Sequence, residues 1–284
     1  MKRSIENQIF DEERALYHLV DAEVKNCTFA GPADGESALK ESHNVAVSDC
    51  KFSLRYPFWH TTDFTVCRVS MDEGTRAPLW YAARGDIKET TVEGVKCLRE
   101  CEDVRFSHCT LLSEEFGWRC RRIALTDTTV KSQYLFFDCR DLTLERVTMS
   151  GKYSFQYVDG MMIRDSVLDT KDAFWHAKNV TVYDSVVKGE YLGWYSENLR
   201  LVRCRIEGTQ PLCYCKGLIL EDCTMEGTDL AFEYSDVEAT VNGHILSVKN
   251  PRSGTIVADS VGEIILDSDV MEIEGRVIIR DSAK

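Results

Sequence analysis

The residues able to form a binding or catalytic site recur at one place in a repeating sequence. There an aromatic, charged or amide residue is followed directly by an ionisable or phenolic one. The first position, which we call the platform column, holds Trp59, Trp80, Arg99, Trp118, Phe137, Gln156, Trp175 and Trp194. The second position, the polar column, holds His60, Tyr81, Glu100, Arg119, Asp138, Tyr157, His176 and Tyr195. Together the two columns form what we call the aromatic stripe.

The chemistry of the aromatic stripe is that of a sugar-binding surface. A column of ionisable side chains must face solvent, because unpaired buried charge is prohibitive. Aromatic rings provide platforms for sugar rings, and polar groups beside them provide recognition and acid–base chemistry. The predicted ligand-binding residues are Trp59, His60, Trp80, Tyr81, Arg99, Trp118, Trp175, Trp194 and Tyr195.

Five residues of the polar column are candidate catalytic groups. Glu100 and Asp138 are two repeats apart, roughly 10 Å, near the upper end of the range for inverting glycosidases. In a lyase, Arg119 would neutralise a uronate carboxylate while Tyr157 or His176 takes the proton. A local group of arginines on this acidic chain also suits an acidic sugar: Arg99, Arg119, Arg121 and Arg122.

A structural role for the aromatic stripe competes with the functional one. Stacked aromatic residues on neighbouring strands stabilise sheets without binding anything, and Glu100, Arg119 and Asp138 could form a ladder of ion pairs. The direction of the platform column is also open. Strict alternation along a strand would place it inside, whereas a bend in the strand would expose both columns.

The fold follows from the repeat that carries these columns. One anchor position recurs with spacings of 23, 19 and 21 residues and then 19 seven times: Cys27, Cys50, Val69, Thr90, Cys109, Thr128, Val147, Ser166, Ser185, Cys204 and Cys223. The positions two residues after the anchor and three before it are apolar, and the position directly before it is polar. This alternation indicates short strands. We predict an all-β, right-handed parallel β-helix of about 12 coils, each of about 19 residues with three short strands. Residues 1–236 would form the coils, and residues 237–284 would cap the last open edge.

The 12 cysteines follow the repeat and include no CxxC pair. Cys101, Cys120 and Cys139 share one column with small residues, which suits a buried, reduced thiol acting as a small hydrophobe. We therefore expect neither disulfides nor bound metal, and the sequence indicates no cofactor.

The amino-acid composition limits the kinds of binding partner and the location expected for this protein. A net charge of −13 argues against nucleic acid, whose binding proteins present basic surfaces. No apolar run is long enough for a membrane-spanning helix. The first eight residues lack the apolar region of a secretory signal, so the expected location is cytoplasmic.

Several blocks of the chain resemble an uncharacterised bacterial family of domains of unknown function, similar in fold to the pectin-lyase-like right-handed β-helices. The resemblance rests on residues 54–60, 113–120, 152–157, 172–176 and 211–215 and covers nearly the whole chain. It implies the fold and its handedness, and it brings no established activity.

Three functions remain open at this point. The first is a carbohydrate-active enzyme, a lyase or hydrolase acting on an extended glycan. The second is a glycan-binding protein without catalysis, which would use the tryptophans but not Glu100 or Asp138. The third is a scaffold for protein interactions, a common use of solenoid faces. The sequence does not decide whether the protein is an enzyme, nor its oligomeric state.

Overall fold

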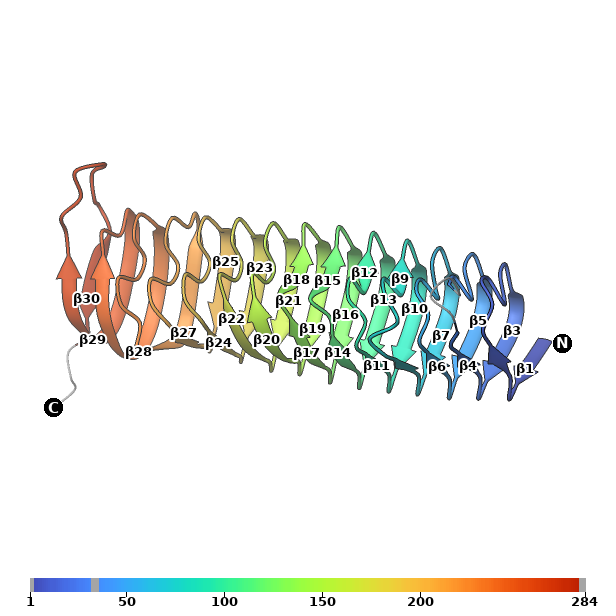
Figure 1. Ribbon diagram of the computed structural model, residues 1–284. Helices are drawn as coiled ribbons and strands as arrows, with labels where there is room; N and C mark the ends of the chain where they lie inside the picture. The colour runs from blue at the N-terminus through green and yellow to red at the C-terminus, as the bar shows by residue number, and fades with distance from the viewer. Residues whose placement is uncertain (1–2, 32–35, 281–284) are drawn as a thin grey trace. The chain divides into compact units, whose positions relative to one another are not determined.

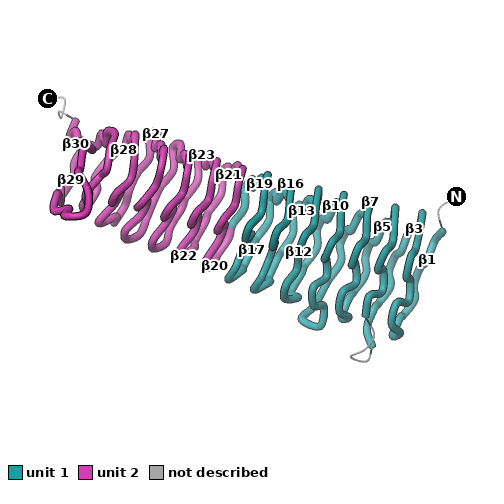
Figure 2. Tube along the Cα trace, turned by 90° about the horizontal axis from the view of Figure 1, so that it is seen from above, with its two compact units in different colours: residues 1–148 teal, residues 149–284 magenta. Residues whose placement is uncertain are grey.

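β-Strands make up the regular structure of this protein. The computed structural model describes residues 3–31 and 36–280, and no helix occurs among them. The chain forms two compact units, residues 1–148 and residues 149–284 (Figure 2). Within each unit successive coils pair through parallel strands, which Figure 1 follows along the chain. The predicted all-β parallel β-helix is confirmed, with about 14 turns about 19 residues apart.

Unit 1 contains three series of strands. The long strands are β1 (Arg3–Glu6), β3 (Val20–Lys25), β5 (His43–Ser48), β7 (Thr62–Cys67), β10 (Ala83–Lys88), β13 (Glu102–Ser107), β16 (Arg121–Thr126) and β19 (Arg140–Glu145). The second strands are β2 (Ile9–Phe10), β4 (Thr28–Phe29), β6 (Lys51–Phe52), β8 (Ser70–Met71), β11 (Thr91–Val92), β14 (Thr110–Leu112) and β17 (Thr129–Ser132). The third strands are β9 (Leu79–Trp80), β12 (Leu98–Arg99), β15 (Glu115–Trp118) and β18 (Tyr134–Phe137). From β7 to β18, each coil of unit 1 therefore has the three short strands that the sequence predicts.

The register inside unit 1 is the one that the repeat predicts. Val104 lies opposite Ile123 in the pair formed by β13 and β16. At the anchor column, the backbone N–H of Cys109 donates to Thr128 Oγ1 at 3.3 Å. The next coil continues the series, since the N–H of Thr148 donates to the carbonyl of Thr128 at 3.1 Å. Equivalent residues thus stack one strand spacing apart.

Unit 2 repeats the same coil and then departs from it. Strand β20 (Thr148–Lys152) begins at the last residue of unit 1. It is followed by β21 (Asp159–Arg164), β22 (Val167–Lys171), β23 (Lys178–Tyr183), β24 (Val186–Lys188), β25 (Glu197–Val202), β26 (Arg205–Glu207), β27 (Leu218–Glu226), β28 (Asp236–Lys249), β29 (Ser253–Ile265) and β30 (Arg276–Ile279).

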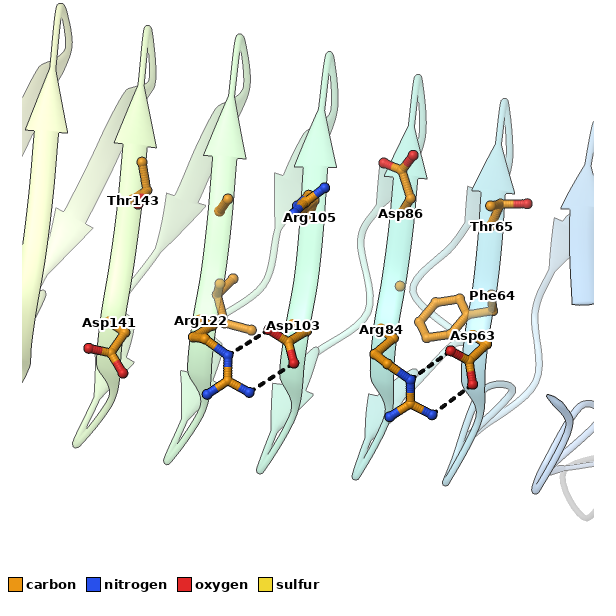
Figure 3. A pocket seen from close by; sticks show the side chains of 13 residues that line it. Asp63, Phe64, Thr65, Arg84, Asp86, Asp103, Arg105, Arg122, Asp141 and Thr143 are labelled. Carbon is orange, nitrogen blue, oxygen red and sulfur yellow. Dashed lines mark hydrogen bonds and ion pairs between the residues drawn. The ribbon is translucent and has the colours of Figure 1, made fainter. Parts of the chain in front are cut away.

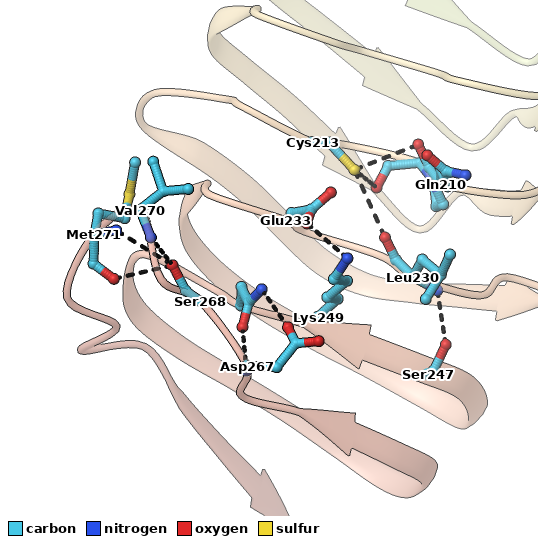
Figure 4. Close-up of polar contacts among 12 residues, drawn as sticks. Gln210, Cys213, Leu230, Glu233, Ser247, Lys249, Asp267, Ser268, Val270 and Met271 are labelled. Atoms are coloured by element: carbon cyan, nitrogen blue, oxygen red, sulfur yellow. Dashed lines mark hydrogen bonds and ion pairs between the residues drawn. The ribbon is translucent and has the colours of Figure 1, made fainter.

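The last three strands still pair in parallel, but their partners are no longer 19 residues apart. Val237 lies opposite Gly254, and Thr255 lies opposite Arg276. Polar contacts tie these coils together, such as the ion pair of Lys249 with Glu233 at 3.0 Å (Figure 4). The predicted boundary between coils and cap at residue 237 stays a prediction. The last four residues of the predicted cap, 281–284, lie outside the described part of the chain.

Each coil turns at residues in the left-handed backbone region. The polar position directly before the anchor has φ between 48 and 55° in Asn26, Asp49, Arg68, Glu89, His108, Asp127, Arg146, Asp165, Asp184, Arg203 and Asp222. Such a residue breaks the strand and directs its own side chain to solvent, which suits Asn, Asp and other polar residues. The polar position directly before the anchor therefore forms a row of corners, one in each coil.

The residue after most of these corners completes the turn with a buried hydroxyl or thiol, and Val69 and Val147 are the exceptions. Thr128 Oγ1 donates to the carbonyl of Thr126 at 2.8 Å and accepts the N–H of Cys109. In unit 2 the N–H of Ser166 donates to Ser185 Oγ at 3.0 Å. Cysteine, serine and threonine exchange in this column because each can accept one backbone bond and donate another.

The cysteines take part in this hydrogen bonding. All twelve thiols are free, eleven are buried, and Cys67 is half-buried. Cys101, Cys120 and Cys139 are at most 2% exposed, as predicted. Cys139 Sγ accepts the N–H of Cys120 at 3.2 Å and donates to the carbonyl of Gly117 at 3.2 Å. The role of a small hydrophobe is therefore only part of why cysteine occurs there.

Candidate functional site

From β9 to β18 the aromatic stripe lies where the third strand of each coil ends, and the stripe residues Trp59, Trp175 and Trp194 lie in turns. In unit 1 these strands end at the platform residues Trp80, Arg99, Trp118 and Phe137. The residue that follows has a left-handed backbone in every case, with φ of 57° at Tyr81, 50° at Glu100, 52° at Arg119 and 52° at Asp138. The chain therefore bends directly after the platform residue, which is one of the two possibilities that the sequence leaves open.

This bend sets the exposure of the two columns. The polar column of unit 1 is exposed except for Tyr81, which is half-buried, and the platform residues are half-buried. The platform column, whose direction the sequence leaves open, is therefore neither fully buried nor fully exposed. The described chain has no helix long and apolar enough to cross a membrane.

Arginine and tryptophan alternate in the platform column of unit 1. The guanidinium carbon of Arg99 lies 4.6 Å from the ring centroid of Trp80 and 5.6 Å from that of Trp118. These residues occupy equivalent positions on β9, β12 and β15, so the cation is sandwiched between two indoles. Cation–π contacts cover the faces of a guanidinium and leave its in-plane N–H groups free to donate. No hydrogen bond from the Arg99 side chain occurs among the described residues.

The polar column of unit 1 contains one ion pair beside a lone carboxylate. Arg119 Nη2 lies 2.9 Å from Glu100 Oε1, with the two side chains 57% and 39% exposed. Asp138, one coil further on, has no ion pair within the described residues. His60 and Tyr81 stack with centroids 4.8 Å apart. The ladder of ion pairs considered from the sequence is therefore realised only between Glu100 and Arg119.

In unit 2 the platform column is a pair of parallel indoles. The rings of Trp175 and Trp194 stack with centroids 5.5 Å apart and planes within 5°. Trp175 Nε1 donates to the carbonyl of Tyr191 at 2.7 Å, and Trp194 Nε1 donates to that of Gln210 at 2.8 Å. Both indoles are thus fixed by stacking and by a hydrogen bond to the backbone.

The polar column of unit 2 is a stack of phenol and imidazole rings. His176 lies between Tyr157 and Tyr195, with centroids 5.0 and 5.1 Å away and planes within 8° of parallel. Tyr214 extends the stack, 4.7 Å from Tyr195. The faces of these rings cover one another, so their outward edges, hydroxyl groups and ring nitrogens are what a ligand would meet.

Two indole donors of unit 1 lack a partner. Trp59 Nε1 and Trp118 Nε1 are buried and have no hydrogen-bond acceptor among the described residues, whereas Trp80 Nε1 donates to the carbonyl of Lys96 at 2.8 Å. Buried polar groups are usually paired. The rings of Trp59 and Trp118 are held instead by aromatic and cation–π contacts, with Lys40 Nζ 4.8 Å from the ring centroid of Trp59.

The structure separates the four arginines that the sequence groups together. Arg99 and Arg119 lie on the aromatic stripe, whereas Arg121 and Arg122 begin the long strand β16. Arg122 forms a two-point ion pair with Asp103, and Arg121 lies 3.4 Å from Asp141. Only Arg99 and Arg119 therefore remain candidates for holding an acidic group on the stripe. Within the described residues, no group of three or more His, Cys, Asp or Glu side chains is placed to hold a metal ion.

These features define a protein class, a parallel β-helix with an aromatic and charged stripe along its third strands. The chain belongs to the DUF3737 family, described as a protein of unknown function, whose model matches residues 3–279. The resemblance to an uncharacterised family is thereby confirmed.

Several solved structures are similar to this chain at low identity. The surface adhesin PfbA of Streptococcus pneumoniae is 8% identical, with a TM-score of 0.45, and the match covers 92% of this chain and 83% of that one. Tailspike protein 3 of bacteriophage CBA120 is 10% identical, with a TM-score of 0.45 and coverage of 97% and 56%. The A-module of the mannuronan C-5 epimerase AlgE6 of Azotobacter vinelandii is 9% identical, with a TM-score of 0.40 and coverage of 94% and 90%.

A search of curated proteins gives no match. The similarity to the solved structures is too low to transfer an activity, so the function is argued from the residues of this chain.

Proposed function

We propose that this protein recognises an extended acidic glycan along the aromatic stripe, with Arg99 as the main contact. The observation that carries the proposal is the position of Arg99 between Trp80 and Trp118. Because both faces of the guanidinium are covered, its remaining donors point along its edge. A planar pair of N–H donors fits the two oxygens of a carboxylate.

The spacing of the coils suits a chain-like ligand. Successive coils rise by about 4.8 Å, close to the length of one sugar unit in an extended glycan. Arg119 follows Arg99 one coil further along, so it could contact a neighbouring unit of the same chain. The half-buried indole edges and the hydroxyl of Tyr81 would contact the sugar rings and their hydroxyl groups.

Because the protein has a negative net charge, its affinity for an acidic glycan depends on direct contacts with basic side chains. A chain of charge −13 repels an anionic ligand at long range. Any affinity for a uronate must therefore come from guanidinium groups that touch it. Loss of the Arg99 side chain should consequently weaken binding strongly, since a hydrogen bond to a charged group contributes about 1.5–3 kcal/mol.

Calorimetry with matched sugars tests this proposal. We expect tetragalacturonate to bind and neutral maltotetraose to bind at least tenfold more weakly. Arg99→Gln should reduce the affinity for tetragalacturonate about tenfold or more, and Arg99→Lys should restore it only in part. Arg76→Gln is the matched control, because Arg76 is an exposed arginine outside the stripe. Equal affinities for Arg99→Gln and Arg76→Gln would refute the role of Arg99.

A lyase acting on the same ligand is the second candidate, and Asp138 is the observation in its favour. Its carboxylate lies one coil from Arg119 and is not engaged in an ion pair within the described residues. In such a reaction Arg119 would neutralise the uronate carboxylate while a base removes the neighbouring proton. The bond to the leaving sugar oxygen then breaks, that oxygen takes a proton, and a carbon–carbon double bond forms.

The catalytic candidates can be tested apart from binding. Glu100, Asp138, Tyr157 and His176 are replaced one at a time by Gln, Asn, Phe and Gln, and new unsaturated sugar ends are followed by ultraviolet absorbance. Turnover that is lost while binding persists would assign catalysis. If the wild-type protein binds the glycan without forming unsaturated or reducing ends, it is a binding protein. If it binds no glycan, a protein-interaction scaffold becomes the better description.

A further inference from the structure

The long strands of unit 1 carry a groove that is separate from the aromatic stripe. It has a volume of about 670 Å³ and runs across β7, β10, β13, β16 and β19 (Figure 3). Its two sides are two rows of outward-facing side chains, two residues apart along each strand. Its volume falls in the range of ordinary ligand sites.

One side of the groove is a series of neutralised ion pairs. Arg84 contacts both carboxylate oxygens of Asp63, at 2.6 and 2.7 Å. Arg122 contacts both oxygens of Asp103, at 2.6 and 2.8 Å. All four residues have positive φ, which places them at corners of the coil. This row presents hydrogen-bond donors and acceptors with little net charge.

The other side of the groove contains an arginine with no partner. Arg105 is exposed, and no ion pair or hydrogen bond of its side chain occurs among the described residues. Its neighbour Asp86, directly opposite on β10, is instead paired with Lys88 at 2.7 Å. On the other flank the opposing residue is Ala124, whose small side chain leaves space beside the guanidinium.

The two large apolar side chains of the groove are buried in the coil. Phe64 and Ile123 contribute to its lining but are only 2% and 1% exposed. The polar contacts open to a ligand come from hydroxyl groups, carboxylates and guanidinium groups on the two sides of the groove. Across five coils the groove is about 19 Å long, which is enough for a few sugar units.

We infer that this groove is a second carbohydrate site, which binds an acidic oligosaccharide through Arg105. The carboxylate or sulfate of the sugar would accept hydrogen bonds from the Arg105 guanidinium, beside Ala124. The Asp63–Arg84 and Asp103–Arg122 pairs would contact its hydroxyl groups. The site shares no residue with the aromatic stripe.

The test uses the full chain carrying Arg99→Gln, which weakens the contribution of the aromatic stripe. Calorimetry is performed with tetragalacturonate, its methyl ester, a sulfated maltotetraose without carboxylates, and maltotetraose. We expect an acidic tetrasaccharide to bind and the uncharged ones to bind at least tenfold more weakly. Whichever of tetragalacturonate and the sulfated maltotetraose binds more tightly distinguishes carboxylate from sulfate. Binding of the methyl ester as tight as that of tetragalacturonate would overturn a carboxylate contact.

Two further substitutions test the residues. Arg105→Gln should weaken binding at least tenfold, and Ala124→Asp should do the same by placing a carboxylate beside Arg105. Arg76→Gln again serves as the control, and circular dichroism confirms that each variant is folded. Affinity unchanged by both groove substitutions, or no affinity of the Arg99→Gln protein for either acidic sugar, would overturn the inference. Preference for an acidic peptide over both acidic sugars would overturn it as well.

The two sites can fail separately. If Arg105→Gln abolishes binding in the wild-type background while Arg99→Gln has no effect, the groove is supported and the proposed function of the stripe is wrong. If only Arg99→Gln reduces binding, the stripe is supported and the groove is wrong.

Discussion

The backbone N–H of Cys109 donates to the hydroxyl of Thr128, which lies at the same corner one coil further along the chain. The same hydroxyl donates to the carbonyl of Thr126. One buried oxygen therefore accepts the N–H of Cys109 and adds a second bond to a carbonyl that already accepts the N–H of His108. This explains why most anchor positions hold cysteine, serine or threonine.

Replacing Thr128 by valine should therefore destabilise the protein. Valine has the same shape but leaves the buried N–H of Cys109 without its acceptor, which costs about 1–3 kcal/mol. The carbonyl of Thr126 keeps the N–H of His108 as a partner. Urea denaturation measures the change. Thr128→Ser keeps the hydroxyl and should stay within about 1 kcal/mol of the wild type. Equal stabilities of the valine and serine variants would show that the hydroxyl does not stabilise the corner.

The thiols should be almost unreactive while the protein is folded. Burial raises the pKa of Cys50 and Cys215 to about 11 and also holds that of Cys97 and Cys101 well above the usual range. Because the thiolate is the reactive species, these groups should not react at pH 8. Titration with a thiol reagent should detect mainly the half-buried Cys67 in the folded state.

In denaturant the same titration should detect all twelve thiols. Fewer than twelve in the unfolded, unreduced chain would show that some are oxidised, contrary to the expectation from the sequence. Cys67→Ser is the matched variant, and it should remove most of the reactivity of the folded protein.

The repeat allowed the strands, the register and the burial of the cysteines to be predicted, because each coil restates the same pattern. The direction of the platform column could not be predicted. It depends on the left-handed backbone of residues such as Glu100 and Arg119, which are not types that usually mark such a turn.

The groove around Arg105 was missed for a related reason. Its alternating charges, Asp63, Arg84, Asp103, Arg122 and Asp141, lie at corners of the coil, outside the columns that the sequence analysis connects with binding. The sign alternation was visible in the sequence and was the available signal. The pairing of Asp86 with Lys88, which leaves Arg105 free, depends on side-chain geometry. The cytoplasmic location stays a prediction.

The ion pairs along the groove predict a loss of stability in acid. The Arg84 guanidinium bonded to Asp63 lowers the pKa of that carboxyl below its usual range, and Arg122 does the same for Asp103. In the unfolded chain these groups titrate near pH 4. Their contribution to stability is therefore complete above pH 4 and is lost as the pH falls through the lowered values.

Thermal unfolding between pH 2 and pH 7 measures this effect. The melting temperature should fall below pH 4, and the Asp63→Asn, Asp103→Asn double variant should show a shallower fall. Because these side chains are partly exposed, salt should reduce the difference between the double variant and the wild type. A double variant with the same pH profile as the wild type would mean that other carboxyl groups control acid unfolding.

The stacked indoles of unit 2 provide the last prediction. Trp175 is half-buried, stacks on Trp194 and donates a hydrogen bond to the carbonyl of Tyr191. Loss of about half the burial of a large side chain, of one stacked pair and of one hydrogen bond should together cost about 2–3 kcal/mol in Trp175→Ala. Trp175→Phe keeps a ring in the stack and should lose only about 1 kcal/mol. Chemical denaturation measures the stability of both variants, and calorimetry of the folded variants with tetragalacturonate measures their binding. A Trp175→Ala protein as stable as the wild type but impaired in binding would mean that the indole serves the ligand and not the fold.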